Sequence, residues 1–139
     1  MTVSIEDKLQ RLLDIEEIRT LRHRYAYGAN IIDGKPGDLQ AFGALFAADG
    51  TFDVGMGVAT GPAEIENMMK ALTTQWQCAM HYMLNPIIEI DGDRARGTVS
   101  GLFAFHVGRE SRADLAVKYL QRRVRADATR LAISVGDDS

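Results

Sequence analysis

The sequence predicts an α+β fold in which helices from the first half of the chain pack on a strongly bent, mostly antiparallel sheet. Apolar residues keep helical spacing through much of the first half, whereas strand-like segments separated by turn residues follow from Cys78 onward. Helices followed by strands favour a layout in which the helices cover one face of the sheet. Because 139 residues is the length of one ordinary domain, we expect residues 1–139 to form a single domain.

A long helix is expected at the start of the chain. Ser4, followed three residues later by Asp7, is typical of a capping box, which marks a helix N-terminus. The next apolar residues keep the helical spacing up to Ala29, and they are Ile5, Leu9, Leu12, Ile15, Ile18, Leu21 and Tyr25. We therefore expect one long helix, with at most one break.

The next segments alternate between turns, helices and one strand. Two glycines and a proline at 33–38 indicate a break, after which 39–49 has helical spacing. Residues 51–58 have strand composition. The early proline at 62 and the acid at 64 then predict a third helix over about 62–75.

Four strands are expected in the second half of the chain. Residues 78–90 and 94–107 are strand-like and are joined by the turn sequence Asp-Gly-Asp. Residues 114–125 and 129–135 continue the pattern. The four segments are expected to form a meander of neighbouring strands.

Composition excludes several classes of function. The chain is 46% hydrophobic and 25% charged, and its net charge is only −3, with arginines and acids interleaved, so we expect no nucleic-acid partner. No apolar run reaches the roughly 18 to 20 residues of a membrane span, so no membrane partner is expected. One cysteine, Cys78, and an N-terminus without signal-peptide features predict a cytoplasmic protein.

Several strings in this order resemble the SnoaL-like branch of the nuclear transport factor 2 superfamily. They are LRHRYAYGANIID, LFAADG, TGPAEIENMM, HYMLNP with IIEIDGDRARG, and RRVRADATRLAIS. The resemblance covers nearly the whole chain and is nearest to the dehydratases and the hexachlorocyclohexane dehydrochlorinase. It implies a cystatin-like cone around an apolar pocket, and a homodimer or homotrimer.

The resemblance implies a catalytic pair. In these relatives a histidine on the third strand region faces an aspartate from the end of the first helix, and the matching positions here are His81 and Asp33. Asp33 lies eight residues after Tyr25, a spacing like that of the dehydrochlorinase rather than the shorter one usual in the wider family. Neutral imidazole would remove a proton beside the leaving group while the carboxylate orients the ring. The alternative is that His81 is a core residue and Asp33 a turn residue.

A leaving group also needs an acid, and Tyr25 or Tyr27 is a candidate because each carries a phenol near the end of the first helix. Tyr25 lies on the apolar stripe, so a packing role is the alternative there. Tyr27 lies off that stripe and is also expected to contribute to substrate binding.

Strand alternation places Met83 and Asn85 on the same face as His81. If that face lines the cone, Asn85 becomes a polar neighbour of the base, and Met83 and Phe103 contribute to an apolar substrate pocket, although both residues also suit a plain core. The histidines at 23, 81 and 106 lack the spacing of a ligand set, so no metal is expected.

The first functional hypothesis is therefore a cofactor-independent lyase that eliminates water or a halide from a small or polycyclic apolar substrate. A ketosteroid-isomerase-like isomerase would use the same base but needs an oxyanion donor that the sequence does not reveal. The other alternative is a non-catalytic module that binds an apolar small molecule or assembles with other subunits.

Overall fold

The computed structural model describes the backbone of residues 2–107, 116–127 and 132–136, and the side chains of residues 2–106. The helices in this part of the chain are α1 (Ile5–Ala29), α2 (Leu39–Gly43) and α3 (Gly61–Thr73). The strands are β1 (Ile31–Ile32), β2 (Lys35–Pro36), β3 (Thr51–Asp53), β4 (Val58–Thr60), β5 (Trp76–Asp91), β6 (Arg94–Val107), β7 (Ala116–Asp127) and β8 (Ala132–Gly136).

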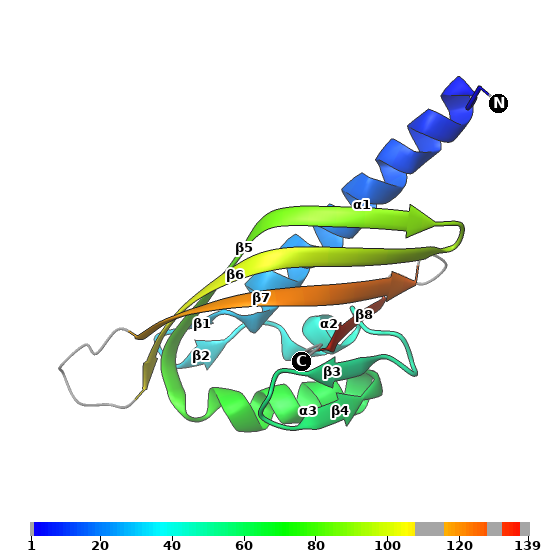
Figure 1. Ribbon diagram of the computed structural model, residues 1–139. Coiled ribbons are helices and arrows are strands. Elements are labelled where there is room, and N and C mark those ends of the chain that lie inside the picture. Colours follow the sequence, from blue (N-terminus) through cyan, green and yellow to red (C-terminus); the bar gives the residue numbers. More distant parts are fainter. Residues whose placement is uncertain (1, 108–115, 128–131, 137–139) are drawn as a thin grey trace.

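All of these strands belong to one sheet, whose order is β2-β1-β5-β6-β7-β8-β3-β4 (Figure 1). The strands β5 to β8 are consecutive antiparallel neighbours, as the sequence predicts. The exception to antiparallel pairing is the contact of β3 with β8, where Phe52 is the partner of Val135. The predicted α+β class, with helices on a mostly antiparallel sheet, is therefore confirmed.

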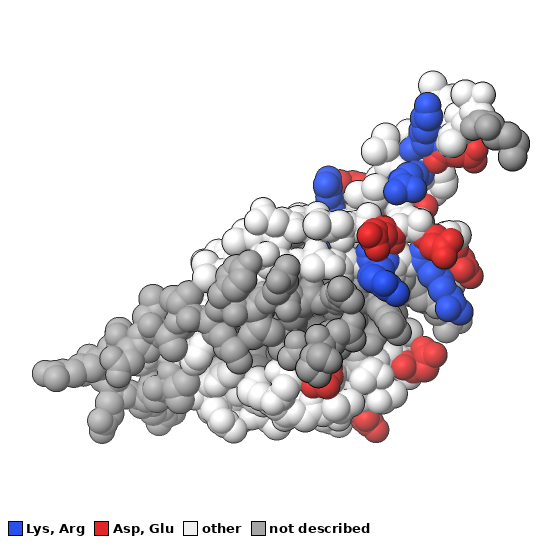
Figure 2. Space-filling model, viewed as in Figure 1, with Lys and Arg blue, Asp and Glu red and all other residues white. Residues whose placement is uncertain are grey.

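α1 begins as predicted and runs without a break over 25 residues. The Ser4 hydroxyl oxygen accepts a hydrogen bond from the Asp7 backbone N–H at 3.0 Å, which satisfies one of the unpaired donors of the first turn. However, the apolar stripe does not form one buried face. Ile18 is buried, whereas Ile5 and Leu9 are 78% and 58% exposed. The first half of α1 projects beyond the sheet, with acids and bases intermixed along it (Figures 1 and 2).

The segment between α1 and α2 contains a hairpin that sequence reasoning missed. β1 and β2 pair through Ile32 and Lys35, so Asp33 and Gly34 form its two-residue turn. Both turn residues have positive φ values, 52° and 71°, as a type I′ turn requires. The same glycine donates its backbone N–H to the Gln77 carbonyl at 2.7 Å, which attaches the hairpin to β5.

Two other predicted elements are shorter than expected. The second helix ends at Gly43 rather than near residue 49. At Gly43 the helix meets α3 so closely that a Cβ would lie 2.7 Å from the Pro62 carbonyl oxygen. The expected strand over 51–58 is instead the hairpin of β3 and β4, because the chain turns back where Gly55 and Gly57 adopt positive φ values.

The main core lies where α1, α2, α3 and β3 meet. Its centre is a group of four aromatic rings, whose centroids lie 5.2 to 6.5 Å apart in tilted and edge-on arrangements. The four are Tyr25, Phe42, Phe46 and Phe52. Such pairs contribute roughly 0.5 to 1.5 kcal/mol beyond simple burial, so this cluster holds the helices to the sheet.

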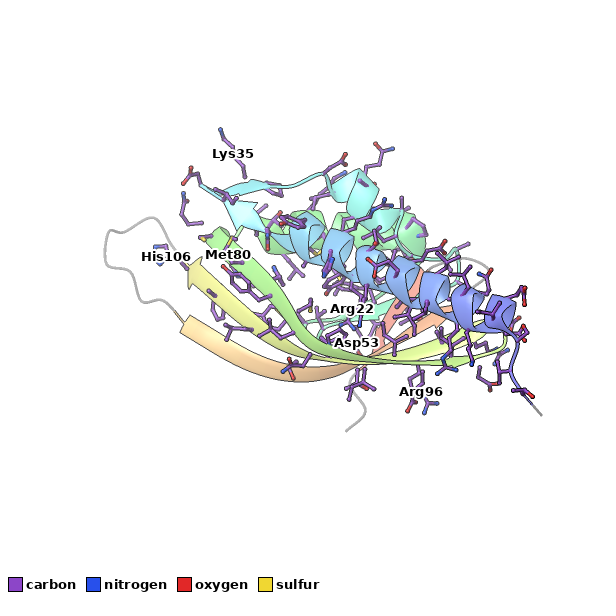
Figure 3. All side chains as sticks on the ribbon, turned by 90° about the horizontal axis from the view of Figure 1, so that it is seen from above. Arg22, Lys35, Asp53, Met80, Arg96 and His106 are labelled. Carbon is purple, nitrogen blue, oxygen red and sulfur yellow. The ribbon has the colours of Figure 1, made fainter. Side chains whose placement is uncertain are left out.

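The sheet curves around α1, which lies along its inner side (Figure 3). β5 changes register between Leu84 and Ile87, and Asn85 within this β-bulge has a φ of 52°. A bulge bends its strand and increases the local twist, which contributes to the curvature. The inner face of the sheet is the surface that carries the candidate functional residues.

Candidate functional site

His81 lies on the inner face of β5, where it is half-buried. Its partner across the ladder is Phe103 of β6, and the two rings meet edge to face with centroids 4.9 Å apart. Met83, the next residue on the same face, packs against the main core. The structure thus brings together three of the residues predicted for the site: His81, Met83 and Phe103.

The side chain that orients His81 is Asn30, the C-terminal capping residue of α1. Its Oδ1 accepts a hydrogen bond from the His81 backbone N–H at 2.8 Å and lies 3.3 Å from the ring Nδ1. The backbone N–H of His81 is a donor, so the Asn30 amide must present its oxygen to it. The same oxygen therefore also faces Nδ1. That arrangement favours the tautomer in which Nδ1 carries the hydrogen and Nε2 carries the lone pair.

Asp33 does not take this position. It is exposed at the tip of the β1–β2 hairpin, and no hydrogen bond or ion pair between Asp33 and another described residue is present. The reason is the register of β1, in which Ile31 pairs with Ala79 and the chain then runs away from His81 toward Gln77. A separation of four strand residues corresponds to roughly 13 Å. The structure therefore brings Asn30, and not Asp33, to His81.

The two tyrosines have different environments. Tyr25 is 7% exposed, and its ring belongs to the aromatic core. Tyr27, which was expected to help bind substrate, is 78% exposed. Because Tyr27 lies two residues after Tyr25 on a helix, it points away from the sheet, as its position off the apolar stripe indicates.

Asn85 is also exposed and is not a neighbour of His81 in the described side chains. The prediction assumed strict alternation along β5, but the β-bulge after Leu84 interrupts it. A single extra residue reverses the direction of every following side chain, so a face assignment cannot be carried across a bulge.

Sequence reasoning missed Arg22, which is 5% exposed and lies between α1 and the sheet (Figure 3). Its Nη1 is buried and has no hydrogen-bond partner among the described residues. Burial lowers the pKa of Arg22 to about 10, and the nearby Tyr25 opposes part of that shift. The signal was present in the sequence, because Arg22 is four residues after Ile18 and three before Tyr25, on the buried stripe of α1.

Asn30 was also missed. Its signal was its position, five residues after Tyr25 and directly after the predicted helix end at Ala29. A residue that follows directly after the helix can face the neighbouring strand, whereas a residue in the next turn is carried past it.

The described side chains contain no group of three or more His, Cys, Asp or Glu residues arranged to hold a metal ion. His23 is exposed on α1, and His106 lies at the far end of β6 opposite Cys78, separate from His81. Among the helices described, none is both long enough and apolar enough to cross a membrane.

Comparison with known proteins identifies the family. Residues 10–133 match the model of the SnoaL-like domain. No curated protein matches. A solved NTF2-like protein with a cystatin-like fold from Novosphingobium aromaticivorans is 23% identical, with a TM-score of 0.71 over 97% of this chain and 87% of that one.

Two further solved structures share the fold at lower identity. A proposed scytalone dehydratase from the same organism is 16% identical, with a TM-score of 0.71 over 90% of this chain and 80% of that one. A hexachlorocyclohexane dehydrochlorinase from Novosphingobium barchaimii is 17% identical, with a TM-score of 0.72 over 91% and 86%. The family match extends over most of the sequence and agrees with the observed helix order and sheet. The chain belongs to the SnoaL-like family.

Proposed function

We propose that this protein is a cofactor-independent lyase that eliminates water or a halide from an apolar substrate, with His81 as the general base. The supporting observation is the contact of Asn30 Oδ1 with both the backbone N–H and the Nδ1 of His81. This contact favours the tautomer whose Nε2 lone pair can accept a proton. The shared fold with a dehydrochlorinase and a proposed dehydratase is consistent with this reaction class.

In the proposed step, Nε2 of His81 removes a proton from the carbon next to the one that bears the leaving group. The electrons of that C–H bond form the new double bond, and the leaving group departs with the electrons of its own bond. His81 becomes an imidazolium whose Nδ1–H remains directed at Asn30. Phe103, packed edge to face on the ring, limits its rotation.

Asn30 takes the role that the sequence analysis assigned to Asp33, but as a neutral amide. An amide orients the ring as a carboxylate does, yet it adds no negative charge to stabilise the imidazolium. The base is therefore expected to be weaker than a histidine paired with a carboxylate, which suits a substrate with an acidified C–H bond, such as one next to a carbonyl.

The test is turnover by wild type, His81→Gln and His23→Gln of a panel of apolar β-hydroxy ketones and chlorinated cyclohexanes. Alkene absorbance and chloride release are the readouts. We expect His81→Gln to lower the rate by roughly 10² to 10⁴, as is usual for loss of a general base, and the exposed His23 control to leave it unchanged. Equal turnover by wild type and His81→Gln would contradict the proposal.

A second function is favoured by the same neutral amide. A neutral amide as the described partner of the His81 ring also suits a module that binds an apolar small molecule without converting it. Binding of a panel compound near His81, seen as shifts of its ring resonances, together with no turnover of any compound, would support this alternative.

We also propose that the chain assembles with copies of itself through the outer face of the sheet. Tyr82, Leu84 and Ile87 on β5 are 46%, 44% and 65% exposed there. The occupant is taken to be a second copy because related proteins of this fold are expected to be homodimers or homotrimers.

Leu84→Glu should reduce the sedimentation mass to that of a monomer. Leu9→Glu, on the projecting half of α1, is the control that should leave the mass unchanged.

A further inference from the structure

Arg22 is a buried charge that has no ion-pair partner among the described residues. It is 5% exposed, and no acid within 4.0 Å of its guanidinium is found among the described residues, whose ion pairs are Arg19 with Glu16 and Lys70 with Glu66. The Nη1 atom is buried, and no hydrogen-bond partner for it is found in the part of the chain whose side chains are described. Buried charges are normally paired, because an unpaired buried charge is strongly destabilising. An arginine kept in this state therefore suggests that a ligand supplies the missing anion.

The position of Arg22 is fixed by the contacts on either side of it along α1. Ile18 packs with Ala95 at the start of β6, and Asn30 binds His81, whose ladder partner is Phe103. Arg22 lies between these points and so faces the middle of β6. Figure 3 shows its side chain directed from α1 toward the inner face of the sheet.

The sheet surface in this region is apolar and carries small residues. Gly97 is buried and has no side chain, and Val99, the next residue on that face, is 2% exposed. The ladder partner of Gly97 is the partly buried Ile88. A flat apolar group can lie against such a surface more closely than against a surface of large side chains.

The acid labelled near Arg22 in Figure 3 is Asp53 of β3. Its Oδ1 accepts the Gly55 backbone N–H at 2.9 Å, and it makes no ion pair within 4.0 Å with Arg22. Asp53 is half-buried and takes part in a local turn. It therefore does not neutralise Arg22, and the guanidinium keeps its capacity for an external anion.

We propose that Arg22 binds the carboxylate of an apolar carboxylic acid, whose apolar body lies against the inner face of β6. A guanidinium matches a carboxylate in a planar, two-point geometry. A monoanion balances the single charge of Arg22, whereas a phosphate dianion would leave an uncompensated negative charge among apolar groups. Arginine is also less strongly hydrated than lysine, which suits it to an enclosed site.

The distance between Arg22 and Asn30 along α1 sets the length of a substrate that could reach both ends of the site. Eight residues separate Arg22 from Asn30 on α1, which corresponds to roughly 12 Å along the helix axis. A molecule anchored by its carboxylate at Arg22 would reach His81 only with a body of two or three fused rings or an equivalent chain. The identification of this acid as the substrate rests on the proposed function, whereas its binding does not.

The test uses 2-naphthoate and its neutral isostere 2-naphthamide, titrated into the full chain by calorimetry at pH 7. We expect wild type to bind the naphthoate at least tenfold more tightly than the amide. Arg22→Met should abolish that preference, and Arg24→Met should retain it, because Arg24 is exposed on the same helix. Arg22→Lys, which keeps the charge but not the planar pair of donors, should give an intermediate preference.

The His81→Gln variant distinguishes carboxylate binding at Arg22 from the lyase activity. It should keep the full preference for the naphthoate even though it loses turnover. The carboxylate site is overturned if wild type binds the two compounds equally or binds neither, or if Arg22→Met keeps the preference. If Arg22→Met does not fold, the wild-type ratio and the Arg22→Lys variant still decide the outcome.

Discussion

Asn30 Oδ1 lies 2.8 Å from the backbone nitrogen of His81 and 3.3 Å from its Nδ1, so that one amide oxygen fixes both the backbone and the ring of the histidine. This contact joins the end of α1 to the middle of β5, 51 residues later in the chain. It links the path of the backbone directly to the proposed chemistry, because the position of the base depends on where the helix ends.

Replacing Asn30 with aspartate should strengthen the base. A carboxylate at this position stabilises the imidazolium form, so the pKa of His81 should rise relative to wild type. NMR titration of the ring resonances measures the change, and His23 in the same spectra is the control. Asn30→Leu should remove the Asn30 acceptor from the ring and lower any turnover. No difference between the Asn30→Asp and wild-type titrations would contradict the contact.

Asp33 should be a structural residue of its turn. Its φ of 52° is tolerated by Asp and Asn but is strained for a β-branched side chain. We expect Asp33→Asn to change the free energy of unfolding by less than about 0.5 kcal/mol, and Asp33→Val to lower it by about 1 to 3 kcal/mol. Urea denaturation measures both. A shift of the His81 titration in Asp33→Asn would instead support the pairing that the sequence analysis predicted.

Arg22→Met should stabilise the protein while it removes the proposed carboxylate site. Replacing an unpaired buried charge with an apolar side chain of similar length is expected to raise the free energy of unfolding by about 1 to 3 kcal/mol at pH 7. Urea denaturation again gives the value. A loss of stability would show that Arg22 has a counterion in the folded protein.

The advantage of Arg22→Met should shrink at high pH. The folded-state pKa of Arg22 is about 10, well below the ordinary value that it has in the unfolded chain. Between these values the unfolded chain binds the proton more strongly, so the stability of wild type relative to the variant rises with pH. At pH 7 both states are protonated and the full penalty remains. Denaturation of the two proteins at pH 7, 9 and 10.5 tests this trend through their difference, in which the other titrating groups cancel.

Phe42→Ala should be among the most destabilising substitutions in the described core. Phe42 is 1% exposed and contacts three other rings, at centroid distances of 5.2, 5.5 and 5.8 Å. Removal of a buried phenylalanine side chain costs roughly 3 to 5 kcal/mol. Phe42→Leu is the matched control, and its smaller loss should show that the cavity, not the change of residue alone, causes the effect.

Alanine substitutions at Gly61 and Gly92 should distinguish the cost of backbone strain from the cost of a steric clash. Both have positive φ values, 80° and 58°, but a Cβ at Gly61 would lie 2.8 Å from the Ala48 carbonyl oxygen, whereas one at Gly92 has nothing within 4 Å. Gly92→Ala should therefore cost only about 1 kcal/mol of strain, and Gly61→Ala clearly more. Thermal unfolding compares them, and equal losses would mean that α3 moves to accept the new methyl group.

The sequence by itself determined the class of fold and the order of the long elements. Apolar spacing, the Ser4 cap and the turn residues between β5 and β6 are local signals, so they identify α1, α3 and the long strands without knowledge of the rest of the chain. They also placed His81, Met83 and Phe103 on strands that proved to be neighbours. The sequence also showed a charged residue, Arg22, on the buried stripe, but it did not show that this residue lacks an ion-pair partner among the described residues.

Only the tertiary structure decided which residues meet. The partner of His81 depends on where α1 ends and on the register of β1 against β5, and a shift of a few residues replaces Asp33 with Asn30. The β-bulge in β5 moved Asn85 to the surface, and Ile5 and Leu9 stay exposed because no described element packs against them. Each of these outcomes depends on contacts between segments far apart in the chain, which local periodicity does not encode.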